Sequence, residues 1–145
     1  MSGKRYEGQI DPRTQFRHGT GTYHYKNPYF KYTGEWVNNK KQGQGRFELG
    51  DGSYYEGDFL NGEMTGNGVM NWANGSRYTG NFVNGAKHGH GEFLARDGSV
   101  YVGDWKNNLR EGRGKLTTAD GTTIEGEFKA HKPNGQIKLE TSDGI

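Results

Sequence analysis

Apolar and polar residues alternate along most of this chain, and glycine interrupts the alternation at regular intervals. Tyrosine, glycine and an aromatic residue occupy every second position in segments such as 32–36 and 101–105. Because successive side chains of a β-strand point to opposite faces, this spacing places the three residues on one face of a sheet. No segment of the sequence shows the period of an amphipathic helix, so the pattern predicts an all-β protein.

The pattern returns every 23 residues: tyrosines lie at positions 32, 55, 78 and 101, and Ile124 takes the next place. Glycine follows two residues after each of these positions, and a Gly-x-Gly pair lies eleven and thirteen residues after each tyrosine. An aromatic residue follows at the fourth position, as Trp36, Phe59, Phe82, Trp105 and Phe128. A fixed step over most of the chain predicts a repeat array in which each unit contacts mainly its neighbours.

Turn-forming dipeptides separate the predicted strands. One set follows the first strand of the units, at Asn38-Asn39, Asn61-Gly62, Asn84-Gly85 and Asn107-Asn108. Asparagine and glycine suit the positive φ that a two-residue hairpin connection requires. A second set closes the other edge, at Asp51-Gly52, Asn74-Gly75, Asp97-Gly98, Asp120-Gly121 and Asp143-Gly144. Each unit is therefore predicted to be a β-hairpin.

We predict an elongated, single-layer, twisted antiparallel sheet of successive hairpins. Only 29% of the residues are hydrophobic, too few for two packed layers, whereas aromatic residues reach 13%. Large rings can lie across glycine backbone and supply the apolar packing of a single layer. With two strands per unit, the sheet advances about 10 Å per repeat. The opposite face is expected to carry a solvated, mostly acidic row, at Glu35, Asp58, Asn81, Asp104 and Glu127.

The units at the two ends depart from the pattern. We expect residues 1–31 to form a divergent N-terminal repeat or cap, residues 32–123 four regular repeats, and residues 124–145 a divergent C-terminal repeat. Ile10, Ile124 and Ile137 replace an aromatic residue, a tyrosine and a glycine. Terminal units of repeat arrays commonly diverge in this way. The chain ends where another unit would begin, which is compatible with a fragment or with one domain of a longer array.

The motif Y-x-G-x-[WF]-x-x-[NG]-x-x-x-G-x-G, followed by D-G, resembles the MORN (membrane occupation and recognition nexus) repeat over nearly the whole chain. Residues 27–36 are most similar to MORN-only proteins of cilia and other microtubule-based structures. The resemblance implies an elongated sheet used for assembly and for binding protein partners, in a cytoskeletal, axonemal or ciliary setting. Where family members are enzymes, a separate catalytic domain performs the chemistry, and the sequence contains none.

The residues themselves also favour a non-enzymatic protein. The Gly-x-Gly pairs do not extend to a phosphate-binding motif, and no Gly-Lys-Ser/Thr occurs. There is no cysteine, and His88 and His90 lack a third metal ligand, so we expect neither a metal nor a cofactor. A net charge of +2 disfavours nucleic acid as a partner. The N-terminal residues do not read as a signal peptide, and no apolar run is long enough to span a bilayer, so we expect a cytoplasmic location.

Two binding surfaces are predicted. The first is an aromatic face for protein partners, formed by Trp36, Phe47, Phe59, Met70, Trp72, Phe82, Phe93 and Trp105. The alternative is a basic edge for phosphoinositide or another anionic membrane surface, formed by Lys40, Lys41, Lys87, Arg110 and Lys132. Unpaired strands at the ends of the sheet add a further expectation, self-association by strand addition.

Overall fold

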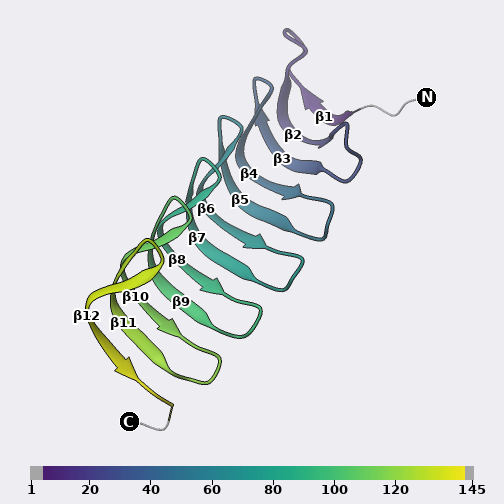
Figure 1. Cartoon of the computed structure of the whole chain (residues 1–145). Helices are drawn as coiled ribbons and strands as arrows, with labels where there is room; N and C mark the ends of the chain where they lie inside the picture. Colours follow the sequence, from purple (N-terminus) through teal and green to yellow (C-terminus); the bar gives the residue numbers. More distant parts are fainter. Residues whose placement is uncertain (1–4, 143–145) are drawn as a thin grey trace.

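The computed structural model describes residues 5–142, which form one 12-stranded antiparallel sheet (Figure 1). The strands lie in the sheet in the order in which they occur in the chain. Their bounds are β1 (Tyr6–Ile10), β2 (Arg17–His24), β3 (Lys31–Val37), β4 (Lys40–Glu48), β5 (Tyr54–Leu60), β6 (Glu63–Asn71), β7 (Arg77–Val83), β8 (Ala86–Leu94), β9 (Val100–Lys106), β10 (Leu109–Thr117), β11 (Thr123–Lys129) and β12 (Lys132–Glu140). The described residues contain no helix, and the predicted single-layer, all-β architecture is confirmed.

Two kinds of turn connect the strands. Within the four regular hairpins the first turn residue is asparagine with a positive φ of 47–50°, at Asn38, Asn61, Asn84 and Asn107, as the sequence predicts, and Ala130 takes this place in the last hairpin with a φ of 49°. At the other edge, the side chain of the first turn residue accepts a hydrogen bond from the amide two residues later. The Asp51 carboxylate accepts from Ser53 at 2.8 Å, and Asn74, Asp97 and Asp120 repeat this contact. The predicted turn at Asp143-Gly144 lies outside the described residues.

The tyrosine of each regular repeat is buried against bare backbone. Tyr32, Tyr55 and Tyr78 are 0% exposed and Tyr101 is 2% exposed. Each ring lies over the second glycine of the Gly-x-Gly pair on the next strand, and a Cβ at Gly45 would overlap the Tyr32 ring. The phenol then donates a hydrogen bond to the carbonyl three residues along its own strand, at 2.8–3.0 Å in all four repeats. This bond satisfies the polar end of a side chain that is otherwise removed from water.

The strand register aligns these glycines into a continuous row across the sheet. Gly34 pairs with Gly45, and Gly45 pairs in turn with Gly57 on the following strand. A Cβ at Gly34 would lie 2.5 Å from the Cα of Gly45, and a Cβ at Gly45 would overlap the Tyr32 ring, so each strand of the pair requires glycine for its own reason. The row consists of Gly8, Gly21, Gly34, Gly45, Gly57, Gly68, Gly80, Gly91, Gly103, Gly114 and Gly126, and it ends at Ile137.

The last repeat shows that the tyrosine and the glycine depend on one another. Ile124 occupies the tyrosine place on β11, and Ile137 occupies the glycine place on β12 that a tyrosine ring would cover. Both departures occur in the same repeat. Because Ile124 places no aromatic ring over β12, a side chain can be present at position 137.

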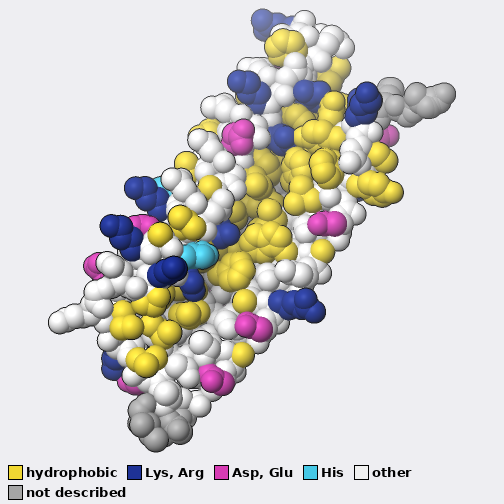
Figure 2. Space-filling model, in the orientation of Figure 1, with side chains coloured by type: hydrophobic (Ala, Val, Ile, Leu, Met, Phe, Trp, Pro, Cys, Tyr) yellow, Lys and Arg dark blue, Asp and Glu magenta, His cyan; other side chains and the backbone are white. Residues whose placement is uncertain are grey.

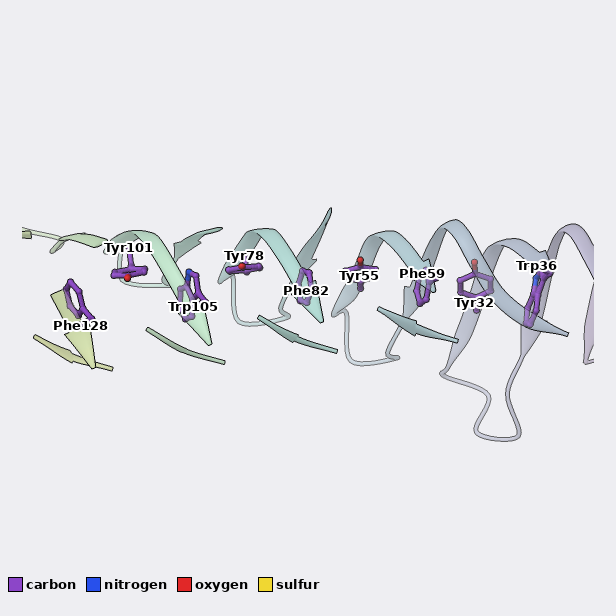
Figure 3. Close-up of a cluster of buried hydrophobic side chains, with 9 residues drawn as sticks. All are labelled: Tyr32, Trp36, Tyr55, Phe59, Tyr78, Phe82, Tyr101, Trp105 and Phe128. Carbon is purple, nitrogen blue, oxygen red and sulfur yellow. The ribbon is translucent and has the colours of Figure 1, made fainter. Parts of the chain in front are cut away.

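The buried rings form one continuous chain of edge-to-face contacts (Figure 3). Tyr32 contacts Trp36 of its own strand with centroids 5.1 Å apart, and Phe59 of the next repeat at 4.9 Å. The same alternation continues to Phe128, with interplanar angles of 82–89° throughout. Aromatic pairs favour this geometry, because the positive edge of one ring meets the negative face of the next. The nine buried rings are therefore the hydrophobic core.

The first glycine of each Gly-x-Gly pair has a different role. The register shifts between Gly34 and Trp36, and Gly43 on the facing strand has a φ of 87°. The amide of Gln44 donates a hydrogen bond to the Glu35 carboxylate at 2.8 Å. Asp58, Asn81 and Asp104 accept the equivalent bonds in the next three repeats. The prediction of a merely solvated row is thus incomplete, because these side chains accept amide hydrogen bonds at the β-bulges.

We expect the ring–glycine contact to appear as a strong coupling between Tyr78 and Gly91. Gly91→Ala should destabilise the folded chain by about 3 kcal/mol, because its Cβ overlaps the Tyr78 phenol and the packed sheet resists the ring's movement. In a Tyr78→Ile background, Gly91→Ala should lower the stability much less, since the ring is then absent, as it is at Ile124 in the last repeat. Urea unfolding of the four proteins in this double-mutant cycle measures the coupling. Additive effects would contradict a direct ring–glycine contact.

A second prediction concerns alkaline pH. Burial raises the pKa of Tyr78 and of Tyr101 from 10.0 to about 12, and it raises the pKa of Tyr32 and Tyr55 as well. The folded chain therefore retains protons that the unfolded chain releases above pH 10, so stability that is present below pH 10 is lost as the pH approaches 12. Phenolate absorbance should show these four tyrosines ionising only together with unfolding. Ionisation of all nine tyrosines near pH 10 in the folded chain would count against their burial.

Candidate functional site

A groove runs along the face of the sheet that carries the tyrosine rings. Figure 2 shows hydrophobic side chains gathered along the middle of this face, with Lys and Arg side chains among them. The half-buried side chains that pack on the core here are Tyr6, Tyr23, Tyr25, Phe47, Met64, Met70, Trp72, Phe93, Leu116 and Ile124. Five of them, Tyr23, Phe47, Met70, Phe93 and Leu116, stand two residues after the second glycine of a Gly-x-Gly pair, so the repeat itself builds much of the groove.

The eight residues of the predicted aromatic face divide into two groups. Trp36, Phe59, Phe82 and Trp105 are only 3–4% exposed, so they support the groove from beneath and offer little surface to a partner. Phe47, Met70, Trp72 and Phe93 are half-buried: the first two and Phe93 line hollows of the groove, and Trp72 packs beside Phe93. Trp72 lies 5.6 Å from Phe93, which in turn lies 6.1 Å from Trp105. The accessible part of the predicted surface is therefore the second group, above the buried rings.

Cations lie inside the groove, over the rings. The Lys87 ammonium is 5.3 Å from the ring centroids of both Trp72 and Trp105, 5.6 Å from Phe93 and 5.9 Å from Tyr78. Four rings therefore surround one charge and attract it through their negative faces. Partial burial in this apolar surrounding lowers the pKa of Lys87, because the charged form loses hydration.

Three further cations occupy the equivalent place in other repeats. The Arg17 guanidinium lies 4.7 Å from the Trp36 ring, and the Lys41 ammonium lies 5.3 Å from Phe47. The Arg110 guanidinium lies 5.5 Å from Phe128. Burial lowers the pKa of Arg110 in the same direction as that of Lys87. Each of the four cations stands two residues before the first glycine of a Gly-x-Gly pair, a place that Met64 and Pro133 fill elsewhere.

These cations have no acidic partner within the described chain. The ion pairs between residues 5 and 142 involve other basic side chains, such as Arg46 with Glu56 at 3.3 Å. The Arg17 and Arg110 Nε atoms are buried, and neither has a hydrogen-bond partner within this part of the molecule. One of the two terminal nitrogens of Arg110, Nη2, does donate to the His131 carbonyl at 2.7 Å. The groove thus carries positive charge that the chain itself leaves unneutralised.

One hollow of the groove lies between two of these cations. A hollow of about 230 Å³ is lined by Lys87 and Arg110, with Trp105 and Phe93 among its apolar residues. His131 stands at its border, where its Nδ1 accepts a hydrogen bond from the Arg110 amide at 3.1 Å. Burial and the two neighbouring cations lower the pKa of His131, which favours its neutral form.

The structure does not bring the predicted basic edge together. Lys40 and Lys132 are exposed, whereas Lys41, Lys87 and Arg110 are half-buried over aromatic rings. The five predicted cations divide in this way because Lys41, Lys87 and Arg110 share a face with the second glycine of the pair, four residues later, whereas Lys40 and Lys132 stand one place earlier in the repeat. The predicted edge also omits Arg17, which the same two-residue spacing would have included.

The histidines have hydrogen-bonding roles at the hairpins. His18 and His88 stand in equivalent places, and their Nδ1 atoms accept hydrogen bonds at 3.4 Å from the amides of Asn38 and Asn107. These two histidines therefore make the same structural contact in two different repeats. No group of three or more potential metal ligands is found among residues 5–142. The same residues include no helix that is long and apolar enough to cross a membrane.

Comparison with solved structures identifies a similar sheet. The TCP domain of SAS-4 (dCPAP) from Drosophila melanogaster, solved in complex with a proline-rich motif of Ana2 (dSTIL), aligns with a TM-score of 0.54. The alignment covers 88% of this chain and 69% of that chain, at 16% sequence identity. At this identity the likeness concerns the fold.

Comparison with protein families is more specific. The MORN repeat profile matches six segments, at residues 16–27, 32–54, 55–77, 78–100, 101–123 and 125–136. MORN repeats are non-catalytic modules that generally mediate protein or membrane interactions. Since the matched segments cover most of the sequence, and the four longest of them correspond to the hairpins β3–β4, β5–β6, β7–β8 and β9–β10, the chain belongs to the MORN repeat family.

Proposed function

We propose that this chain is a non-enzymatic scaffold that binds protein partners in its groove. The observation that carries the proposal is a continuous second tier of accessible apolar side chains, at Phe47, Met70, Trp72 and Phe93, above an already complete core. Exposed apolar surface of this kind commonly marks a site of interaction. The similar TCP domain was solved with a proline-rich motif of another protein, which supports a peptide-binding use for an open sheet.

The polar groups of the repeat support a binding role better than a catalytic one. The phenols of Tyr55 and Tyr78 donate to backbone carbonyls, and the Asp58 carboxylate accepts a backbone amide. The Ser53 hydroxyl accepts a hydrogen bond from the Ala73 amide at 2.9 Å. These groups are engaged in holding the sheet together, whereas a catalytic nucleophile needs a base and a free approach to its substrate.

A cytoskeletal or ciliary assembly is the setting that we propose, on the resemblance of residues 27–36 to MORN-only proteins of such structures. We further propose that residues 32–123 provide the regular binding surface, with residues 1–31 and 124–145 as divergent end repeats. Each terminal strand of the described sheet has one edge without a strand partner among those residues. Strand addition at these edges is the route we propose for self-association.

Binding to an anionic membrane surface is the alternative. Lys40 and Lys132 are exposed and available to lipid head groups. The half-buried positions of Lys41, Lys87 and Arg110 favour the groove hypothesis, because a flat bilayer reaches recessed charges poorly.

The proposal predicts that Trp72→Gln together with Met70→Gln weakens capture of protein partners about tenfold, since both side chains lie in the groove rather than in the core. The control is Leu60→Gln with Val83→Gln, two apolar residues that are 47% and 43% exposed. Quantitative affinity capture from cytoplasmic extract, with circular dichroism to verify folding, measures the effect. Equal capture by the folded groove variant and the wild type would refute the groove.

Sedimentation with vesicles that contain phosphatidylserine distinguishes membrane binding from partner binding in the groove. We expect little pelleting of the wild-type chain at physiological salt. Strong pelleting that disappears in a Lys40→Gln, Lys132→Gln variant would establish the membrane function instead.

A further inference from the structure

The charged side chains that line the groove are positive over most of its length. Three hollows lie on this face of the described chain, and the cations that line them are Arg17, Lys40, Lys41, Lys87 and Arg110. Glu63 is the one carboxylate among the residues that line these hollows, and it stands beside Met64, where a repeat lacks the cation. Since the chain carries 17 acidic residues against 19 basic ones, the positive groove results from placement rather than composition.

Holding these charges in the groove costs free energy that the chain recovers only in part. A buried charge is unfavourable unless it is paired or fully hydrogen-bonded. The rings around Lys87 provide partial compensation, but no carboxylate pairs with Lys87 or Arg110 in the described chain, and the Arg110 Nε has no partner. An anionic group that enters the hollow between Lys87 and Arg110 would pair with both side chains, because carboxylates accept hydrogen bonds from ammonium and guanidinium groups.

The spacing of the cations indicates the shape of that partner. Lys87 and Arg110 occupy equivalent places in successive repeats, so they are separated by two strand spacings, about 10 Å along the groove. In a polyproline II helix every third side chain lies on the same face, about 9 Å further along. An extended segment lying along the groove in this conformation therefore presents residues i and i+3 in step with the repeats.

We propose that the groove recognises an acidic, extended protein segment in polyproline II conformation, with carboxylates three residues apart that pair with Lys87 and Arg110. This inference rests on the proposed partner-binding function and specifies the chemistry of the partner. The apolar stems and intervening residues of the segment pack on Phe93, which lines the hollow, and on Trp72 beside it. Lys41 and Arg17 offer the same pairing further along the groove, beyond the neutral Met64.

A narrow segment suits this site better than a broad anionic surface does. The cations lie on the floor of the groove among rings, with Lys87 within 6 Å of four of them (5.3, 5.3, 5.6 and 5.9 Å). A single extended chain can enter between the sides of the groove and place a carboxylate at that depth. Lipid head groups that project from a flat bilayer meet the exposed Lys40 and Lys132 first.

Fluorescence anisotropy with labelled peptides of equal length tests the inference. One probe repeats the triplet Pro-Pro-Glu, a second repeats Pro-Pro-Gln, and a third contains the prolines and glutamates of the first in two separate blocks. We expect the Pro-Pro-Glu probe to bind the whole chain, the neutral probe to bind about tenfold more weakly, and the block probe to fall between them. Binding of the Pro-Pro-Glu probe should weaken as salt is raised, because screening reduces charge pairing.

Variants then locate the binding. Lys87→Met and Arg110→Met should each weaken binding of the Pro-Pro-Glu probe about tenfold, and together they should remove its preference over the neutral probe. Methionine is the matched replacement, because Met64 already fills this place in another repeat. Lys132→Met removes an exposed cation that lines none of the three hollows and should leave binding unchanged. Circular dichroism verifies that each variant is folded.

The outcomes distinguish this inference from the function on which it rests. Equal binding of the charged and neutral probes, or no binding of any probe while partner capture still depends on Trp72 and Met70, would overturn the acidic-segment inference and leave the partner-binding function standing. Binding of the Pro-Pro-Glu probe that survives the Lys87 and Arg110 substitutions would also overturn it. Loss of groove-dependent partner capture, combined with strong binding to phosphatidylserine vesicles, would overturn both.

Discussion

A tyrosine ring lying against main chain that has no Cβ is the contact on which the rest of this sheet depends. A single β-layer has no second layer to cover its apolar face, so each repeat must bury its large side chain within its own surface. The register places glycine at the same level on every strand from β1 to β11, and Tyr32 and its equivalents occupy the space that results. The ring at one repeat then contacts the next, which links the repeats into one core.

The same arrangement explains why the face is suited to binding. The buried rings already form the core, so the half-buried side chains above them are available to contact a partner. Phe47, Met70, Trp72 and Phe93 lie in this second tier, and Lys87 and Arg110 are set among the rings rather than at the outer edge. The ring contacts of the core are the same in every regular repeat, whereas the side chains of the groove differ between repeats. Met64, for example, stands where other repeats carry a cation.

Much of the fold is predictable from the sequence, because each interaction of the repeat is local and recurs with a fixed step. The hairpins, the turns at Asn38 and its equivalents, and the face shared by Tyr32 and Trp36 all follow from period-two spacing. The site is less predictable. The alternation does not distinguish Trp36, which is buried between Tyr23 and Tyr32, from Trp72, which is half-buried beside Phe93, because it assigns both to an apolar face without giving their ring contacts. The four-residue spacing between Lys87 and Gly91 indicates that both residues lie on the same face of the sheet. The position of Lys87 near the hairpin turn points instead to the edge of the sheet, where the sequence analysis places it.

Proton chemical shifts of the glycine row test the ring–glycine contact most directly. A proton held against an aromatic face experiences the ring current, so one Hα of each of Gly45, Gly68, Gly91 and Gly114 should resonate far upfield of its usual position. Gly135, whose missing side chain faces open space, should show ordinary Hα shifts in the same spectrum. Ordinary shifts at all five glycines in the folded protein would show that the tyrosine rings do not lie on the bare backbone, and would contradict the basis of the fold.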